Sequence, residues 1–257
     1  ALEIMHYAIE NKDALVPLEI VFTVQEEIGV LGADYLNKDK LNSKQGFVLD
    51  GDTDVGTVIV QAPYKWKYFL NVLGRSAHAA IDPASGINAI RVLGSVINSL
   101  PCGKIDEYTV TNYGIVKGGS ATNVVPDKVG LIGELRGRDL DTIQTIQKNI
   151  REGVEKIVSE YGASFDLEWK SLYPGYSVSL EDLCMRCFVA ACNKLGIESR
   201  YVVTDGGGDA NHLNGAGIVC VPFGLGMKDI HTNQEHIKLS DFHLAFDLLL
   251  ECLQGDL

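Results

Sequence analysis

Apolar residues recur along this chain with two spacings, one typical of helices and one typical of strands. Recurrence every three or four residues marks amphipathic helices, and short apolar or alternating runs mark strands. The predicted helices cover residues 2–9, 30–36, 86–100, 139–161, 180–195 and 239–253. The predicted strands cover residues 20–24, 47–49, 57–62, 65–74, 108–116, 129–136, 165–169, 200–203 and 218–222. This mixture of strands and helices indicates an α/β protein.

The pattern changes in the middle of the chain. From residue 65 to 74 apolar and polar residues alternate, which predicts an antiparallel strand with one covered face. The middle region then reads strand, helix, strand, strand, helix, strand, an order typical of a ferredoxin-like α+β domain. We therefore predict that residues 63–174 form a domain inserted into a single α/β domain made of residues 1–62 and 175–257.

Composition narrows the functional classes. The chain has 257 residues, of which 46% are apolar and 22% are charged, and its formal net charge is −12. This acidic balance argues against a nucleic-acid-binding surface. No apolar run approaches the ~18 residues of a membrane span. The six cysteines are scattered in apolar surroundings, which predicts reduced thiols and a cytoplasmic location.

Acidic side chains follow two of the predicted strands. Glu26 and Glu27 come after residues 20–24, and Asp50 comes after residues 47–49. Open α/β sheets place their ligand crevice at the carboxyl ends of strands. Adjacent carboxylates there can divide labour, one holding a metal ion and the other moving protons. The alternative is a solvated turn in which the glutamates only favour a helix N-terminus.

A histidine and a glycine-rich loop add to these candidates. His231 follows the predicted strand at residues 218–222. A lone loop histidine is usually a surface residue, but Glu, Asp and His at one sheet edge form an ordinary zinc ligand set. The glycines at 206–208 allow close backbone approach just before Asp209. Without a GxGxxG or Lys-Ser/Thr pattern, they do not indicate a nucleotide site.

Taken in order, the motifs resemble the co-catalytic zinc metallopeptidases and aminoacylases, a family that includes peptidase T and succinyl-diaminopimelate desuccinylase. The matching segments are TVQEEIG at 23–29, LDG at 49–51, GRSAHA at 74–79, GGSATNVVPD at 118–127, GELR at 133–136 and HTNQE at 231–235. Asp50 and the GGDANH segment at 207–212 favour the peptidase T branch. The resemblance implies a zinc-exopeptidase-like mixed sheet with helices on both faces, and an inserted ferredoxin-like lid or dimerisation domain.

The resemblance also implies roles for the acidic residues and the loop histidine. Glu26 is expected to be the general base, which takes a proton from the attacking water and passes it to the leaving amine. Glu27 and His231 are expected to hold one zinc ion, and Asp50 the other. Cobalt or manganese could replace zinc. The two metal ions would polarise the scissile carbonyl together.

Three residues of the middle domain are implied as substrate-binding. His78 would stabilise the carbonyl oxygen as it becomes anionic, reaching the site across a dimer or on lid closure. Asn123 and Arg136 would bind a substrate carboxylate or backbone, arginine through its bidentate fork. The expected partners are a short peptide substrate and a second copy of the chain, bound through the lid domain. Neither nucleic acid nor membrane is expected.

The chain departs from the family pattern in one respect. The family has a His-x-Asp pair upstream of the two glutamates, whereas His6 is followed here by Tyr7 and Ala8. The chain also opens on a helical pattern with no strand before it. We therefore expect that an N-terminal part of the catalytic domain is missing from these residues, and that they are inactive alone.

Three functions are compatible with these residues. The first is a zinc-dependent hydrolase that cleaves amide bonds of short peptides, a tripeptide-aminopeptidase-like exopeptidase. The second is an aminoacylase or deacylase that acts on N-acyl amino acids, because the same metal pair hydrolyses either amide. The third is a non-catalytic relative that binds or dimerises. The retention of Glu26, Glu27, Asp50 and His231 argues for a hydrolase.

Overall fold

The computed structural model describes residues 1–11 and 14–254. These residues form two compact units, one made of Ala1–Ala62 with Tyr173–Leu257 and the other of Pro63–Leu172. We call them unit 1 and unit 2. Within the described ranges, no helix combines the length and the apolar character needed to cross a membrane.

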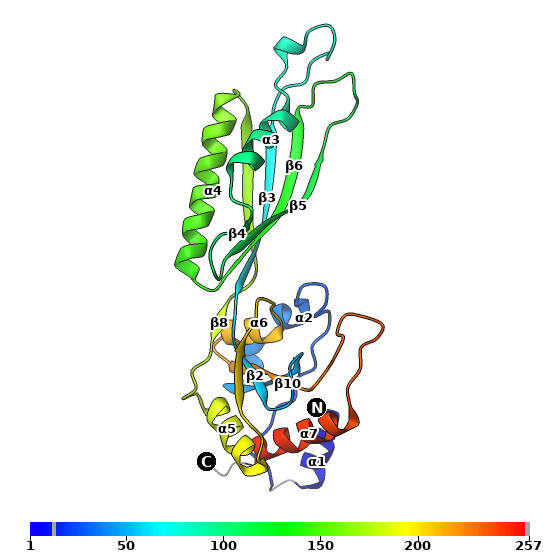
Figure 1. Cartoon of the computed structure of the whole chain (residues 1–257), viewed down its shortest axis with the longest axis vertical. Helices are drawn as coiled ribbons and strands as arrows, with labels where there is room; N and C mark the ends of the chain where they lie inside the picture. Colours follow the sequence, from blue (N-terminus) through cyan, green and yellow to red (C-terminus); the bar gives the residue numbers. More distant parts are fainter. Residues whose placement is uncertain (12–13, 255–257) are drawn as a thin grey trace. The chain divides into compact units, whose positions relative to one another are not determined.

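Unit 1 contains a mixed five-stranded sheet (Figure 1). Its strands are β1 (Gln45–Gly51), β2 (Thr57–Ala62), β8 (Tyr176–Ser177), β9 (Arg200–Val203) and β10 (Val219–Gly224). The order is β1-β10-β2-β8, with β9 also paired to β2. Strand β10 runs parallel to β1 and antiparallel to β2. This mixed pairing confirms the predicted architecture.

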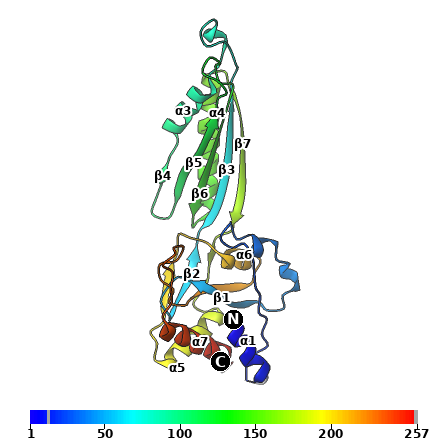
Figure 2. The same cartoon turned by 90° about the vertical axis from the view of Figure 1, so that its right-hand side faces the viewer.

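Helices cover both faces of the sheet of unit 1. They are α1 (Leu2–Glu10), α2 (Leu31–Tyr35), α5 (Leu183–Leu195), α6 (Asp209–Gly215) and α7 (Leu239–Leu253). Figure 2 shows α5 and α7 on one side of the sheet and α6 on the other. Phe188 of α5 stacks edge-on against Phe223 of β10, and both side chains are fully buried. Burial of this helix face therefore fixes α5 against the sheet.

Unit 2 has the ferredoxin-like arrangement that the order of its elements predicts. Its strands are β3 (Tyr64–Leu73), β4 (Gly103–Lys104), β5 (Val110–Gly118), β6 (Lys128–Gly137) and β7 (Ser164–Tyr173), in the order β4-β5-β6-β3-β7. Helices α3 (Ala89–Ser99) and α4 (Leu140–Glu160) lie together and contact this sheet (Figure 1). Asn88 and Asp139 cap them by accepting hydrogen bonds from backbone N–H groups of the first turn.

One predicted strand is wrong. Residues 20–24 form no strand, although their apolar, β-branched composition is typical of one. Phe22 and Val24 are 63% and 69% exposed, whereas Ile20 packs against the core of unit 1. Since a strand needs a hydrogen-bonded neighbour, composition alone was not sufficient, and no described strand pairs with this segment.

Candidate active site

Glu26 and Glu27 lie in a tight turn that leads into α2. The carbonyl of Glu26 accepts hydrogen bonds from the N–H groups of Gly29 and Val30, at 3.0 and 2.7 Å. Gln25 and Val30 have φ values of 60° and 59°. This left-handed conformation is unfavourable for residues with a Cβ, and most of all for a β-branched valine. The glutamates therefore project from a strained turn, not from the end of the predicted strand.

Asp50 and His231 are positioned by two neighbouring strands, Asp50 within β1 and His231 in the loop after β10. Strands β1 and β10 are parallel, so Asp50 near the end of β1 and the loop after β10 lie at the same edge of the sheet. Gly51 follows Asp50 at an irregular point of the ladder, where an added Cβ would lie 2.5 Å from the carbonyl oxygen of Phe223. Only glycine fits at this contact. His231 itself has a φ of 60°, which is a second strained position.

The structure brings Glu27 and His231 together. The Oε2 atom of Glu27 lies 3.3 Å from Nδ1 of His231, and both side chains are well exposed. Zinc–oxygen and zinc–nitrogen bonds are about 2.0–2.2 Å long, so two ligands of one tetrahedral ion lie roughly 3.4 Å apart. The pair is therefore spaced as two ligands of a single metal ion would be.

Helix α6 adds an acidic residue that the sequence pattern did not assign to the site. Asp209 Oδ2 accepts a short hydrogen bond from the hydroxyl of Thr23, and Oδ1 is buried without a hydrogen-bond partner among the described residues. Glu26 faces the start of the same helix, because its Oε1 atom lies 3.5 Å from a Cβ built on Gly208. In the sequence, only the three glycines before Asp209 indicated a close backbone approach at this point. They did not indicate which residue lies close to them.

The carboxylates influence one another electrostatically. Burial, and then the charge of Asp50, raises the pKa of Glu26 above its ordinary value. Partial desolvation, and then the charge of Asp209, raises the pKa of Asp50, although Asp50 is exposed overall. In both cases Glu27 adds to the shift and His231 opposes it. The mutual repulsion means that a cation would be favourable among these side chains.

The residues fit a divalent metal in part. The donor chemistry, the Glu27–His231 spacing and the unpartnered Oδ1 of Asp209 all suit a cation. Across residues 1–11 and 14–254, however, no three His, Cys, Asp or Glu side chains are close enough to hold one. The described residues therefore offer side chains of the metal-ligand type, but no three of them lie close enough to form a complete site.

In unit 2, His78 and Asn123 are neighbours. The N–H of Ala79 donates to the carbonyl of Asn123 at 3.0 Å, and His78 forms a bridge with Val124. The Nδ1 atom of His78 accepts from the N–H groups of Ala80 and Ile81, at 3.3 and 3.2 Å. A neutral His78 ring therefore carries its proton on Nε2, which remains available as a hydrogen-bond donor.

Arg136 lies at the opposite end of the sheet of unit 2. It pairs with Lys65 at the start of β3, whereas Lys128, which follows the Asn123 loop, pairs with Leu73 at the end of β3. At ~3.4 Å per residue, this length of strand places Arg136 roughly 27 Å from Lys128. Arg136 donates through Nε to Glu134 at 3.0 Å. Within one copy of unit 2, Arg136 therefore does not join His78 and Asn123.

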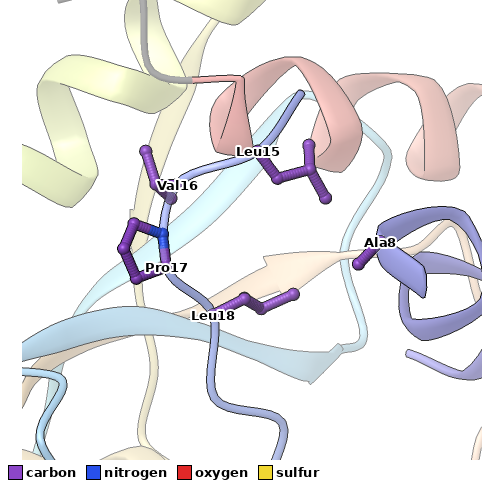
Figure 3. A pocket seen from close by; sticks show the side chains of 5 residues that line it. All are labelled: Ala8, Leu15, Val16, Pro17 and Leu18. Atoms are coloured by element: carbon purple, nitrogen blue, oxygen red, sulfur yellow. The ribbon is translucent and has the colours of Figure 1, made fainter. Parts of the chain in front are cut away.

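Unit 1 also contains a pocket. It is lined by Ala8, Leu15, Val16, Pro17 and Leu18 (Figure 3). These side chains are aliphatic and offer no acid, base or metal ligand. We therefore do not assign the pocket a part in chemistry.

Comparison with known proteins identifies the family. Residues 65–162 match the model of the peptidase dimerisation domain of M20 proteins. A tripeptidase of Staphylococcus aureus and the aminopeptidase PepT of Bacillus cereus are 31% and 30% identical to this chain, with TM-scores of 0.89 and 0.87. Each alignment covers 98% of this chain and 68% of the solved chain. The chain belongs to the M20 peptidase family.

Other relatives match this chain over only part of their own length. The YqjE protein of Bacillus subtilis is 30% identical over 237 residues, which are 92% of this chain and 64% of that protein. An N-acetylcysteine deacetylase of Bacillus subtilis is 24% identical, over 75% of this chain and 53% of its own length. A dinuclear metal binding M20 peptidase of Bacillus subtilis shares the fold, with a TM-score of 0.68 and 21% identity. The alignment covers 90% of this chain and 62% of that chain. The chain thus spans between one half and two thirds of these relatives.

Proposed function

We propose that the full-length protein is a zinc-dependent hydrolase that cleaves amide bonds of short peptides, as a tripeptide-aminopeptidase-like exopeptidase. The observation that carries this proposal is the Glu27–His231 pair, spaced at 3.3 Å like two ligands of one metal ion and placed next to Glu26. The similarity to a tripeptidase and to PepT supports the substrate class. All six cysteines are unpaired, which supports a cytoplasmic location.

In this proposal unit 1 supplies the base and some of the metal ligands. Glu27 and His231 would hold one zinc ion, and Asp50 would hold the second. When bound, the ions polarise the scissile carbonyl and make water acidic enough to react near neutral pH. Glu26 takes the proton of the attacking water on its carboxylate and delivers it to the leaving amine nitrogen.

Unit 2 supplies the groups that bind substrate and stabilise charge. His78 donates from Nε2 to the carbonyl oxygen as negative charge develops there. Asn123, which neighbours His78, orients the substrate backbone, and Arg136 binds a carboxylate. Because Arg136 and Asn123 lie at opposite ends of one sheet, we infer that one site draws them from two copies of unit 2. The match to a peptidase dimerisation domain supports such a homodimer.

A deacylase acting on N-acyl amino acids is the second candidate. The same base and metal ions hydrolyse either amide, and the similarity to an N-acetylcysteine deacetylase favours this reaction. The two candidates differ in what they require of the substrate nitrogen. An aminopeptidase needs a free amino terminus, whereas a deacylase acts on an amine that carries an acyl group.

The test uses the full-length protein purified without added metal. Metal analysis is expected to find about two zinc ions per chain, and EDTA is expected to abolish hydrolysis until zinc is restored. Cleavage of Ala-Ala-Ala but not of N-acetylalanine supports the exopeptidase, and the reverse preference supports the deacylase. His231→Ala is expected to lower zinc content, with His243→Ala on the exposed face of α7 as the matched control. A metal-loaded protein that cleaves neither substrate would contradict both candidates.

A further inference from the structure

The segment that carries Glu26 and Glu27 has few described attachments. Residues 18–24 lack regular secondary structure, and their exposed side chains include Phe22 and Val24. At its start, Glu19 accepts hydrogen bonds from Asn42 and Ser43. Among the described residues between Glu19 and Glu26, only Thr23 has a side-chain hydrogen bond to another element. The position of the glutamate turn therefore depends on a small number of contacts.

The hydroxyl of Thr23 donates to Oδ2 of Asp209, the first residue of α6. The two residues are far apart in sequence but both belong to unit 1. A hydrogen bond to a carboxylate is stronger than one between neutral groups. The side chain of Glu26 lies close to Gly208, the residue directly before Asp209. The Thr23–Asp209 hydrogen bond is therefore near the side chain that we expect it to orient.

The turn itself is strained, so it needs such support. Gln25 and Val30 on either side of the two glutamates both have left-handed backbone conformations. Such conformations are unfavourable for residues with a Cβ and persist only when surrounding contacts hold them. The Thr23–Asp209 hydrogen bond lies two residues before the first of these positions.

We propose that Thr23 and Asp209 form a positioning pair that holds the Glu26–Glu27 turn against α6 in its working geometry. Neither residue needs to touch the substrate. Asp209 acts through Thr23 on the backbone that orients Glu26, and its Oδ1 is buried without a described hydrogen bond. The catalytic part of this inference rests on the proposed role of Glu26, but the structural part does not.

The test compares Thr23→Val, Thr23→Ser and Asp209→Ala with the double variant Thr23→Val/Asp209→Ala, in the zinc-loaded full-length protein. The first readout is hydrogen exchange at the amides of Gly29, Val30 and Leu31, which close the turn. We expect Thr23→Val and Asp209→Ala each to speed this exchange roughly tenfold or more, because loss of a hydrogen bond to a charged group makes local opening of the turn more frequent. Thr23→Ser keeps the hydroxyl and should retain wild-type exchange.

The second readout is hydrolysis of Ala-Ala-Ala. Thr23→Val is expected to lower kcat about tenfold to a hundredfold with KM nearly unchanged, and Thr23→Ser to restore it. The kcat of the double variant should be no lower than that of the more impaired single variant, because both substitutions remove the same contact. Thr53→Val is the matched control, since the buried Thr53 hydroxyl has no described hydrogen bond.

Three results would overturn the positioning pair. They are unchanged exchange in Thr23→Val, failure of Thr23→Ser to restore kcat, and losses in the double variant that add as independent effects. A fall in melting temperature together with unchanged exchange and kcat would show a merely structural role. If the wild-type protein cleaves no amide, the proposed function fails, and the exchange comparison alone still decides whether the pair holds the turn.

Discussion

Gly32, in the first turn of α2, is packed against the backbone of the segment before the two glutamates. A Cβ at this position would overlap the carbonyl oxygen of Val24. Alanine is a better helix former than glycine by about 1 kcal/mol, but this overlap is far too close to be absorbed without moving the backbone. We expect Gly32→Ala to lower the melting temperature by several degrees and to displace the Glu26 turn.

Gly94 of α3 provides the matched control for Gly32. It is also a helical glycine, but a Cβ built there meets nothing within 4 Å outside its own helix. Gly94→Ala should therefore raise stability by up to about 1 kcal/mol. Differential scanning calorimetry of both variants measures the two effects. Equal stabilisation by both substitutions would mean that Val24 does not approach α2 in solution.

A single substitution tests the proposed general base, Glu26. Glu26→Gln keeps the size of the side chain but removes its ability to accept a proton. We expect kcat to fall by about 10²–10⁴, the usual contribution of a general base. Zinc content should stay unchanged, because Glu27 and His231 hold the ion in our proposal. Retention of more than a tenth of wild-type kcat would remove Glu26 from the mechanism.

At the residue scale, a sequence pattern can indicate candidate residues, but it does not indicate the contacts between residues that are distant in the chain. Glu27, Asp50 and His231 follow predicted elements, and parallel strands explain why Asp50 and the His231 loop share an edge. The short Thr23–Asp209 hydrogen bond joins segments that are far apart in the chain. No local pattern encodes such a contact, so Asp209 was not assigned to the site.

At the scale of elements, prediction was reliable where the pattern is local and long. Helix α4 carries apolar residues at helical spacing over its whole length, and the alternation in β3 fixes which side chains face the helices. The apolar run at residues 20–24 failed because a strand also requires a partner. Because the partner of a strand can be distant in sequence, the composition of residues 20–24 could not decide whether they form a strand.

The attachment of the 18–24 segment gives a prediction about pH. Hydrogen bonds from Ser43, and then from Asn42, lower the pKa of Glu19 to about 2, below its ordinary value of 4.5. A carboxyl group with a lowered folded-state pKa stabilises the protein above its unfolded value, and that stabilisation disappears as pH falls through the folded value. Glu19→Gln should therefore lower the melting temperature at pH 6.

The same substitution should lose its effect in acid. Between pH 4.5 and about 2, protonation of Glu19 removes the advantage of the wild-type residue, so the two melting curves should converge. Glu168→Gln, at an exposed position of β7, serves as control and should leave the melting temperature unchanged both at pH 6 and in acid. A difference between Glu19→Gln and wild type that is constant from pH 7 to pH 2 would argue against the ionised contact.

At the scale of the whole molecule, unit 2 has a surface suited to self-association. Strand β4 pairs only with Val110 and Thr111 of β5, so the rest of that edge has no partner among the described residues. Ile115 and Val116 on this part of β5 are exposed. An exposed apolar edge strand is a template for pairing with another chain. We expect Val116→Lys to shift the full-length protein from dimer towards monomer in analytical ultracentrifugation.

In the proposed homodimer, each site could take His78 from its own chain or from the partner chain. If His78 acts across the dimer, a mixture of the inactive variants Glu26→Gln and His78→Ala should regain activity, because one site of each mixed dimer then has an intact Glu26 and an intact His78. Random exchange of subunits makes half of the dimers mixed, so roughly a quarter of wild-type activity is expected. If His78 acts within its own chain, every site lacks one group and the mixture stays inactive. Unfolding and refolding the two variants together, compared with mixing them after separate refolding, controls for subunit exchange.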